Sequence, residues 1–150
     1  MIITKTPYRV SLFGGSTDYY SQYGSTLIGF AINRYCYTSI MKLDEFTDIN
    51  YQAFYSSAER VNTSEEIQNP GIRGTLQFCE KNIPDFKKLA IFIQNELPSK
   101  TGIGSSSSLI VGLLRSIYTL FKIEFDEKQL AQDAIYIERS LLKEPGGIQD

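Results

Sequence analysis

The residues best suited to chemistry stand between Pro98 and Leu109, where two glycines and a run of four consecutive serines follow an apolar stretch. Gly102 and Gly104 allow the backbone to approach a ligand closely. The serine run opens an apolar pattern typical of a buried helix, and the first N–H groups of a helix have no partner within it. Because these groups and the helix dipole attract phosphate, the pattern predicts an anion-binding loop. The alternative is an ordinary capped turn between a strand and a helix, although a cap needs only one serine.

A second candidate is Glu138, a carboxylate within a predicted amphipathic helix. Its neighbours three and four residues away are all apolar, so no cation on the same helix can pair with it; they are Ala134, Ile135, Leu141 and Leu142. A carboxylate among apolar residues needs a partner from elsewhere. The sequence leaves two kinds of partner open, a metal ion or a basic side chain of another element.

A glycine-rich stretch near the amino end contains Gly14, Gly15, Ser16, Thr17 and Asp18. Glycines beside an aspartate and a threonine can close a backbone around a hydroxylated ligand. Turn chemistry alone favours a simpler structure, a turn in which Asp18 caps a helix. Histidine is absent, so any acid–base chemistry must use carboxylates, Lys, Arg, Ser or Tyr.

The composition is that of a globular protein, with 42% hydrophobic and 21% charged residues in a chain of 150. This length predicts a single domain with its own core. The net charge of -2 gives no basic surface, so we expect no nucleic-acid partner. No apolar run reaches about 18 residues, so we expect no membrane span. Cys36 and Cys79 are interpreted as unpaired thiols, which favours a cytoplasmic location.

The elements that must position these residues follow from hydrophobic periodicity. Apolar alternation predicts strands over residues 2–6, 8–13, 26–32, 35–42, 48–55 and 89–94. Helical patterns cover residues 71–81, 105–121 and 127–143. We expect a tight turn at Asn33 and Arg34, and we expect the strand at 48–55 to pair with the preceding strand across residues 43–47. The stretch 56–70 is polar and weakly periodic, and residues 62–66 are able to cap a short helix.

Residues 98–108 resemble the ATP-phosphate loop of the GHMP kinases, the family that contains galactokinase, homoserine kinase and mevalonate kinase. Residues 7–19 resemble the family's first motif, and Glu138 with residues 146–150 resembles its acidic positions. The matches follow in the family's order along the whole chain. Residues 13–19, 32–37 and 65–70 are most similar to the D-glycero-D-manno-heptose 7-phosphate kinases. Ser16 and the Gly147-Ile148 pair depart from the usual pattern.

The resemblance implies an α+β fold, a two-layer sandwich of a mixed, largely antiparallel sheet and helices, like the amino-terminal domain of GHMP kinases. It implies ATP and Mg²⁺ as cofactors, with the metal held by Ser106 and Glu138. It implies Asp150 as the catalytic residue facing the acceptor hydroxyl, with Arg9 close by. The implied ATP-phosphate ligands are Pro98, Gly102, Ile103, Gly104, Ser105, Ser106, Ser107 and Ser108. The implied sugar-binding residues are Gly14, Gly15, Ser16, Thr17 and Asp18.

The resemblance also implies a reaction, transfer of the ATP γ-phosphoryl group to a hydroxyl of a heptose 7-phosphate, and we expect the anomeric one. Two alternatives stay open: another sugar kinase of the family, acting on galactose or fucose, and a non-catalytic module that binds sugar or nucleotide. We expect residues 1–150 to form the family's amino-terminal domain, with no counterpart of its carboxy-terminal domain. On that ground we expect these residues alone to be catalytically inactive. The expected partner is a small-molecule sugar phosphate, and the oligomeric state is left open.

Overall fold

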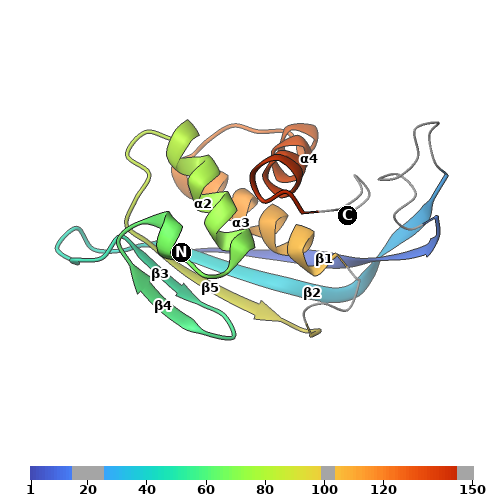
Figure 1. Ribbon diagram of the computed structural model, residues 1–150, viewed down its shortest axis with the longest axis horizontal. Helices are drawn as coiled ribbons and strands as arrows, with labels where there is room; N and C mark the ends of the chain where they lie inside the picture. Colours follow the sequence, from blue (N-terminus) through green and yellow to red (C-terminus); the bar gives the residue numbers. More distant parts are fainter. Residues whose placement is uncertain (15–25, 99–103, 145–150) are drawn as a thin grey trace.

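The computed structural model describes residues 1–14, 26–98 and 104–144, which form two layers, a sheet with helices packed on one of its faces (Figure 1). This confirms the predicted α+β architecture. The strands are β1 (Ile2–Phe13), β2 (Ile28–Lys42), β3 (Tyr51–Phe54), β4 (Ala58–Val61) and β5 (Leu89–Asn95). The helices are the short η1 (Ser64–Glu66), α2 (Pro70–Asn82), α3 (Ser105–Phe121) and α4 (Glu127–Tyr136), followed by η2 (Ile137–Leu141), a single π-helical turn.

The five strands lie in the order β1-β2-β5-β3-β4, and only the β3–β5 pair is parallel. The expected pairing of the strand near residues 48–55 with β2 is wrong, because β5 lies between β2 and β3. Leu89, Ala90 and Ile91 are almost fully buried, as suits a central strand. The connection from β3 to β5 contains α2, and a crossover of this kind is what a parallel pair requires.

The predicted tight turn at Asn33 and Arg34 is also wrong, since β2 runs through both residues. Pro7 pairs with Tyr35 and Arg9 with Ala31. Between these two pairs β2 advances by four residues while β1 advances by only two, so β2 contains extra residues here. The polar pair therefore lies in a bulge rather than in a hairpin loop. Pro7 is tolerated within β1 because this strand is at the edge of the sheet.

Two further differences concern the stretch 56–70 and the last predicted helix. The polar stretch 56–70, for which only a short helix was predicted, contains that helix as η1 and also β4, which pairs with β3 in a short hairpin. The helix predicted to reach residue 143 is regular only to Tyr136 and ends in the π-helical turn η2. No helix in the described ranges is long and apolar enough to cross a membrane.

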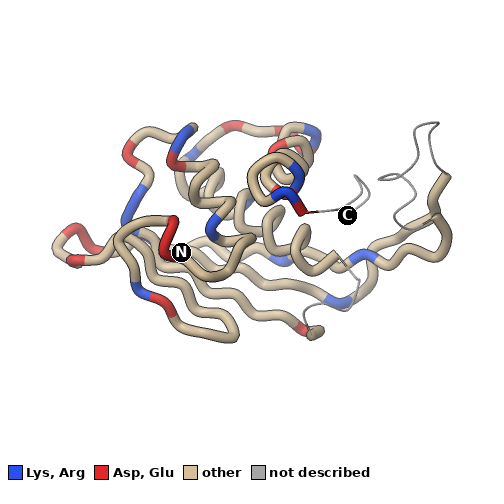
Figure 2. The backbone as a smooth tube through the Cα atoms, viewed as in Figure 1, with Lys and Arg blue, Asp and Glu red and all other residues tan. Residues whose placement is uncertain are grey.

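Helix α3 is the centre of the core, as its apolar sequence predicted. It packs against β1 and β2 below and against α2 and α4 beside it. Leu113, Leu114 and Ile117 are fully buried. At Gly112 the helix comes close to the sheet, where the Thr4 hydroxyl donates to the Gly112 carbonyl oxygen at 2.9 Å. Figure 2 shows that acidic and basic residues are interspersed along the described part of the chain.

Replacing Gly112 by alanine is expected to destabilise the fold, although alanine is the better helix former. An added Cβ would lie 2.6 Å from the Thr6 hydroxyl oxygen and 3.2 Å from that of Thr38, both on strands that cannot easily move. Overpacking of this kind costs about 1 to 3 kcal/mol, which urea unfolding would measure. Gly74→Ala is the comparison within α2: its Cβ would lie 2.8 Å from Leu142 Cδ2 and 3.2 Å from Ile137 Cγ2, side-chain ends rather than groups held on strands, so a smaller loss of stability is expected. A Gly112→Ala protein as stable as the parent would contradict this account of the packing.

Candidate functional site

The start of α3 has the backbone geometry of an open anion-binding site. Gly104 is the N-cap residue and adopts a left-handed conformation, with φ 69° and ψ 33°. Among the described residues, no side chain caps the helix. The first intrahelical acceptor is the Gly104 carbonyl, which receives the Ser108 N–H at 2.9 Å. The N–H groups of the three preceding serines therefore have no acceptor within the helix.

The four serines have different surroundings. The Ser108 hydroxyl donates to the Pro7 carbonyl at 3.0 Å and joins α3 to β1. The Ser107 hydroxyl contacts both carboxylate oxygens of Glu138, at 2.9 and 3.0 Å. The Ser106 hydroxyl lies 3.4 Å from Oε2 of Glu144. Ser105 lines a cavity. Since both the N–H and the hydroxyl of Ser108 have partners within the protein, this serine supports the loop rather than lining its opening.

Glu138 is half-buried in the π-helical turn, and the end of α4 lies beside the first turns of α3 (Figure 1). Burial raises the pKa of its carboxyl group above the ordinary value; the bond from Ser107 opposes this rise, and the charge of Glu144 adds to it. Within the part of the chain that the structure describes, Glu138 forms no ion pair with a lysine or an arginine. Of the two partners that the sequence left open, a basic side chain is therefore not seen there, and a serine of the loop occupies that place.

The end of the π-helical turn brings Glu144 back to the same place. The Leu142 N–H donates to the Ile137 carbonyl at 2.9 Å, five residues back. Lys143 then takes a left-handed conformation with φ 54°. The Glu144 N–H donates to the Glu138 carbonyl at 3.0 Å. This hydrogen bond ties the backbones of the two glutamates together at the start of α3.

A cavity of about 360 Å³ opens beside this helix start, within the usual size range for small-molecule sites. Its walls come from the starts of α2 and α3, the end of β5 and the turn after β3. They combine apolar side chains with amide, hydroxyl and carboxylate groups. The lining residues are Tyr55, Ser56, Asn69, Pro70, Gly71, Ile93, Asn95, Ser105, Ser106, Leu109 and Glu144.

The walls of the cavity are held by hydrogen bonds and close packing. The buried Tyr8 hydroxyl donates to the Asn95 side chain at 2.9 Å, and the Asn69 side chain caps α2 by accepting the Ile72 N–H at 3.1 Å. A Cβ at Gly71 would lie 3.2 Å from Leu109 Cδ2, so a glycine there allows α2 and α3 to approach each other.

The other predicted site residues are only partly described. Arg9 lies half-buried in β1, opposite Ala31. Gly14 has φ 75°, and a Cβ there would lie 2.2 Å from the Thr26 carbonyl oxygen, so only glycine fits. Pro98 follows β5. The remaining predicted residues lie outside the described ranges: Gly15, Ser16, Thr17, Asp18, Gly102, Ile103 and Asp150.

Sequence reasoning missed Glu144 and the cavity. Glu144 follows a lysine near the chain's last glycines and has no feature that separates it from a solvated glutamate. The sequence did contain a signal for the role of Asn69 as the N-cap of α2, because asparagine before proline is a typical start of a helix.

A mixed sheet with helices on one face, and a glycine-capped central helix that opens beside a cavity, define an α+β domain with one candidate site at the start of α3. Residues 71–150 match the family model described as the GHMP kinases N terminal domain. This match spans more than half of the chain, and the chain belongs to the GHMP kinase family.

Similar proteins agree with this assignment. The D-glycero-alpha-D-manno-heptose 7-phosphate kinase of Campylobacter jejuni is 27% identical over 99% of this chain and 46% of its own length. The galactokinase of Thermotoga petrophila is 27% identical over 97% of this chain and 41% of its own. The chain thus spans about half the length of these relatives.

Solved structures share the fold. A D-glycero-D-manno-heptose 1-phosphate kinase from Bacteroides thetaiotaomicron superposes with a TM-score of 0.85 at 22% identity, covering 100% of this chain and 52% of that one. The mevalonate kinase of Methanococcus jannaschii gives a TM-score of 0.78 at 21% identity, covering 99% of this chain and 49% of the other.

Proposed function

We propose that this chain supplies the ATP-phosphate-binding part of a sugar kinase that phosphorylates a heptose 7-phosphate, at its anomeric hydroxyl. The observation that carries the proposal is the start of α3, where N–H groups with no acceptor within the helix, serine hydroxyls and two carboxylates meet beside a cavity. Phosphoryl transfer depends mainly on positioning and charge stabilisation, which such groups supply. The Campylobacter relative, similar along nearly the whole chain, favours the heptose over other sugars.

The phosphates of ATP would bind to the backbone N–H groups of Ser105, Ser106 and Ser107, with Gly104 allowing their close approach. The apolar part of the cavity, formed by Ile93, Leu109 and neighbours, offers contact surface to the rest of the nucleotide. The loop residues Pro98, Gly102 and Ile103 stay predicted ligands, as do the sugar-binding residues at 14–18.

The donor set at the start of α3 fits Mg²⁺, since this ion prefers carboxylate and hydroxyl oxygens. Ser106 and Glu138 would hold it, and Ser107 already orients the Glu138 carboxylate. When bound, Mg²⁺ would offset the negative charge of the phosphates. In this proposal Asp150 orients or deprotonates the acceptor hydroxyl, and Arg9 keeps that carboxylate ionised.

The test is a substrate panel assayed with the longer enzyme that contains this chain, because the relatives are about twice as long. Heptose 7-phosphate, galactose, fucose and mevalonate would be offered with Mg-ATP, and phosphorus NMR would locate the new phosphate. We expect heptose 7-phosphate to give the highest kcat/KM and an anomeric product. A preference for galactose or fucose would select the alternative sugar kinase. Nucleotide binding without turnover of any sugar would select the non-catalytic module.

A further inference from the structure

Glu144 lines the cavity and also contacts the start of α3 through Ser106. The neighbouring serine, Ser107, contacts Glu138. Two adjacent serines at the helix start thus each face a carboxylate. The backbone hydrogen bond from the Glu144 N–H to the Glu138 carbonyl, at 3.0 Å, fixes the spacing of the two glutamates.

The charge of Glu144 has no counterion among the residues that the structure describes. Its contact with Ser106 is long, at 3.4 Å, and a serine hydroxyl cannot neutralise a carboxylate. A fixed negative charge on the wall of a phosphate-binding cavity is unfavourable to phosphate by itself, because like charges repel strongly where water is partly excluded. The same charge favours phosphate that arrives together with a divalent cation.

We propose that Glu144 is a second carboxylate for the divalent cation at this site, acting with Glu138, and that it restricts binding to the metal complex of the nucleotide. The inference rests on the proposed function, since it assumes that phosphate binds at the start of α3. It assigns to Glu144 two effects of opposite sign, attraction of the metal and repulsion of the metal-free nucleotide.

The experiment compares Glu144→Gln with the parent in the longer enzyme, by two binding measurements that need no turnover. Titration with Mn²⁺, followed by the EPR signal of the free ion, gives the metal affinity in the presence of a non-hydrolysable ATP analogue. Calorimetry with the same analogue in EDTA gives the metal-free affinity. We expect Glu144→Gln to bind Mn²⁺ about tenfold more weakly, the lower end of what a metal-orienting group contributes. We expect its metal-free nucleotide affinity to rise severalfold.

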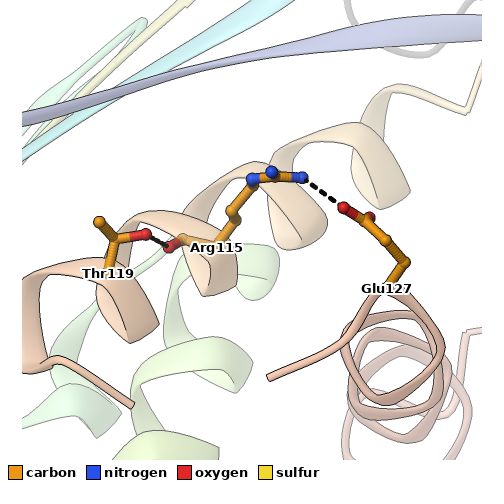
Figure 3. A network of polar contacts seen from close by, with 3 residues as sticks. All are labelled: Arg115, Thr119 and Glu127. Atoms are coloured by element: carbon orange, nitrogen blue, oxygen red, sulfur yellow. Dashed lines mark hydrogen bonds and ion pairs between the residues drawn. The ribbon is translucent and has the colours of Figure 1, made fainter. Parts of the chain in front are cut away.

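The matched control is Glu127→Gln, which removes the same charge at the start of α4. Figure 3 shows Glu127 in an ion pair with Arg115 of α3, at 3.2 Å. Its side chain is 80% exposed, and both affinities should stay at the parent values.

The outcomes separate the inference from the function on which it rests. If the parent binds the analogue with Mn²⁺ and Glu144→Gln matches it in both measurements, only the role of Glu144 is wrong. If Glu144→Gln weakens nucleotide binding equally with and without metal, Glu144 positions Ser106 and is no metal ligand. If the parent binds no nucleotide under either condition, the proposed function fails as well.

Discussion

Replacing Gly104 by valine is expected to weaken nucleotide binding strongly while leaving the fold largely intact. Gly104 has φ 69° and ψ 33°, a conformation that β-branched residues almost never adopt. Accommodating valine would shift the helix start and misdirect the N–H groups that follow. Removing one preorganised N–H or amide donor from an oxyanion hole lowers kcat on the order of a hundredfold or more, and we take the same scale for the loss of donors to the phosphates. We therefore expect the Mg-ATP affinity to fall by about that factor or more in calorimetry.

The fold should survive because α3 is held by its buried middle, at Leu113, Leu114 and Ile117, well inside the helix. Far-UV circular dichroism would verify this. Asparagine tolerates the left-handed region better than other non-glycine residues, so Gly104→Asn should retain more affinity than Gly104→Val. An unchanged affinity in the valine variant would remove the start of α3 from the active site.

The second large effect is expected from Glu138→Gln, which keeps the shape of the side chain and removes its charge. The Ser107 hydroxyl can still donate to the amide oxygen, so the packing of the turn should persist. The loss of a metal ligand should lower turnover of the longer enzyme by on the order of a hundredfold, as found for other groups that stabilise the transition state. Steady-state kinetics at saturating Mg²⁺ would measure it.

The thermal stability of Glu138→Gln, unlike its turnover, is not expected to fall. Burial raises the pKa of the Glu138 carboxyl, so the folded state favours the protonated form more than the unfolded state does. The stabilisation from this group is complete below its unfolded pKa and is lost as pH rises through the folded value. At neutral pH, glutamine removes a partly buried charge, so the Tm should be equal to or higher than that of the parent. Unchanged turnover, or a clear loss of stability at neutral pH, would contradict this account of Glu138.

The features that the sequence predicted best are those with strong local signals. The apolar run from Leu109 to Phe121 predicts a buried helix because its hydrophobic residues surround the helix axis. Glu138 could be selected because its apolar neighbours left it without a local partner, and the structure then places it against Ser107. In both cases the prediction depends only on residues within about one helical turn of the position concerned.

The errors concern contacts made far along the chain. Asn33 and Arg34 have the chemistry of a turn, and only the pairing of β2 with β1 converts them into a bulge. The place of β3 beside β5 depends on a crossover through α2, which no pattern near residue 50 records. Glu144 reaches the site through a left-handed lysine and a bond to Glu138, neither of which sequence periodicity can indicate.

The π-helical turn at Ile137–Leu141 also determines in which direction the side chains after α4 point relative to those that α4 packs into the core. An α-helix rotates about 100° per residue, and a π-turn accommodates one residue more than the regular helix would. Helix α4 can therefore keep Leu130 and Ala134 in the core while the residues beyond the turn are rotated relative to that face. Removing one residue from the turn would restore a regular helix and rotate the helix end, and with it the left-handed Lys143 that follows, by about 100° relative to the core face. The placement of Glu144 beside Glu138 therefore depends on this one extra residue in the turn.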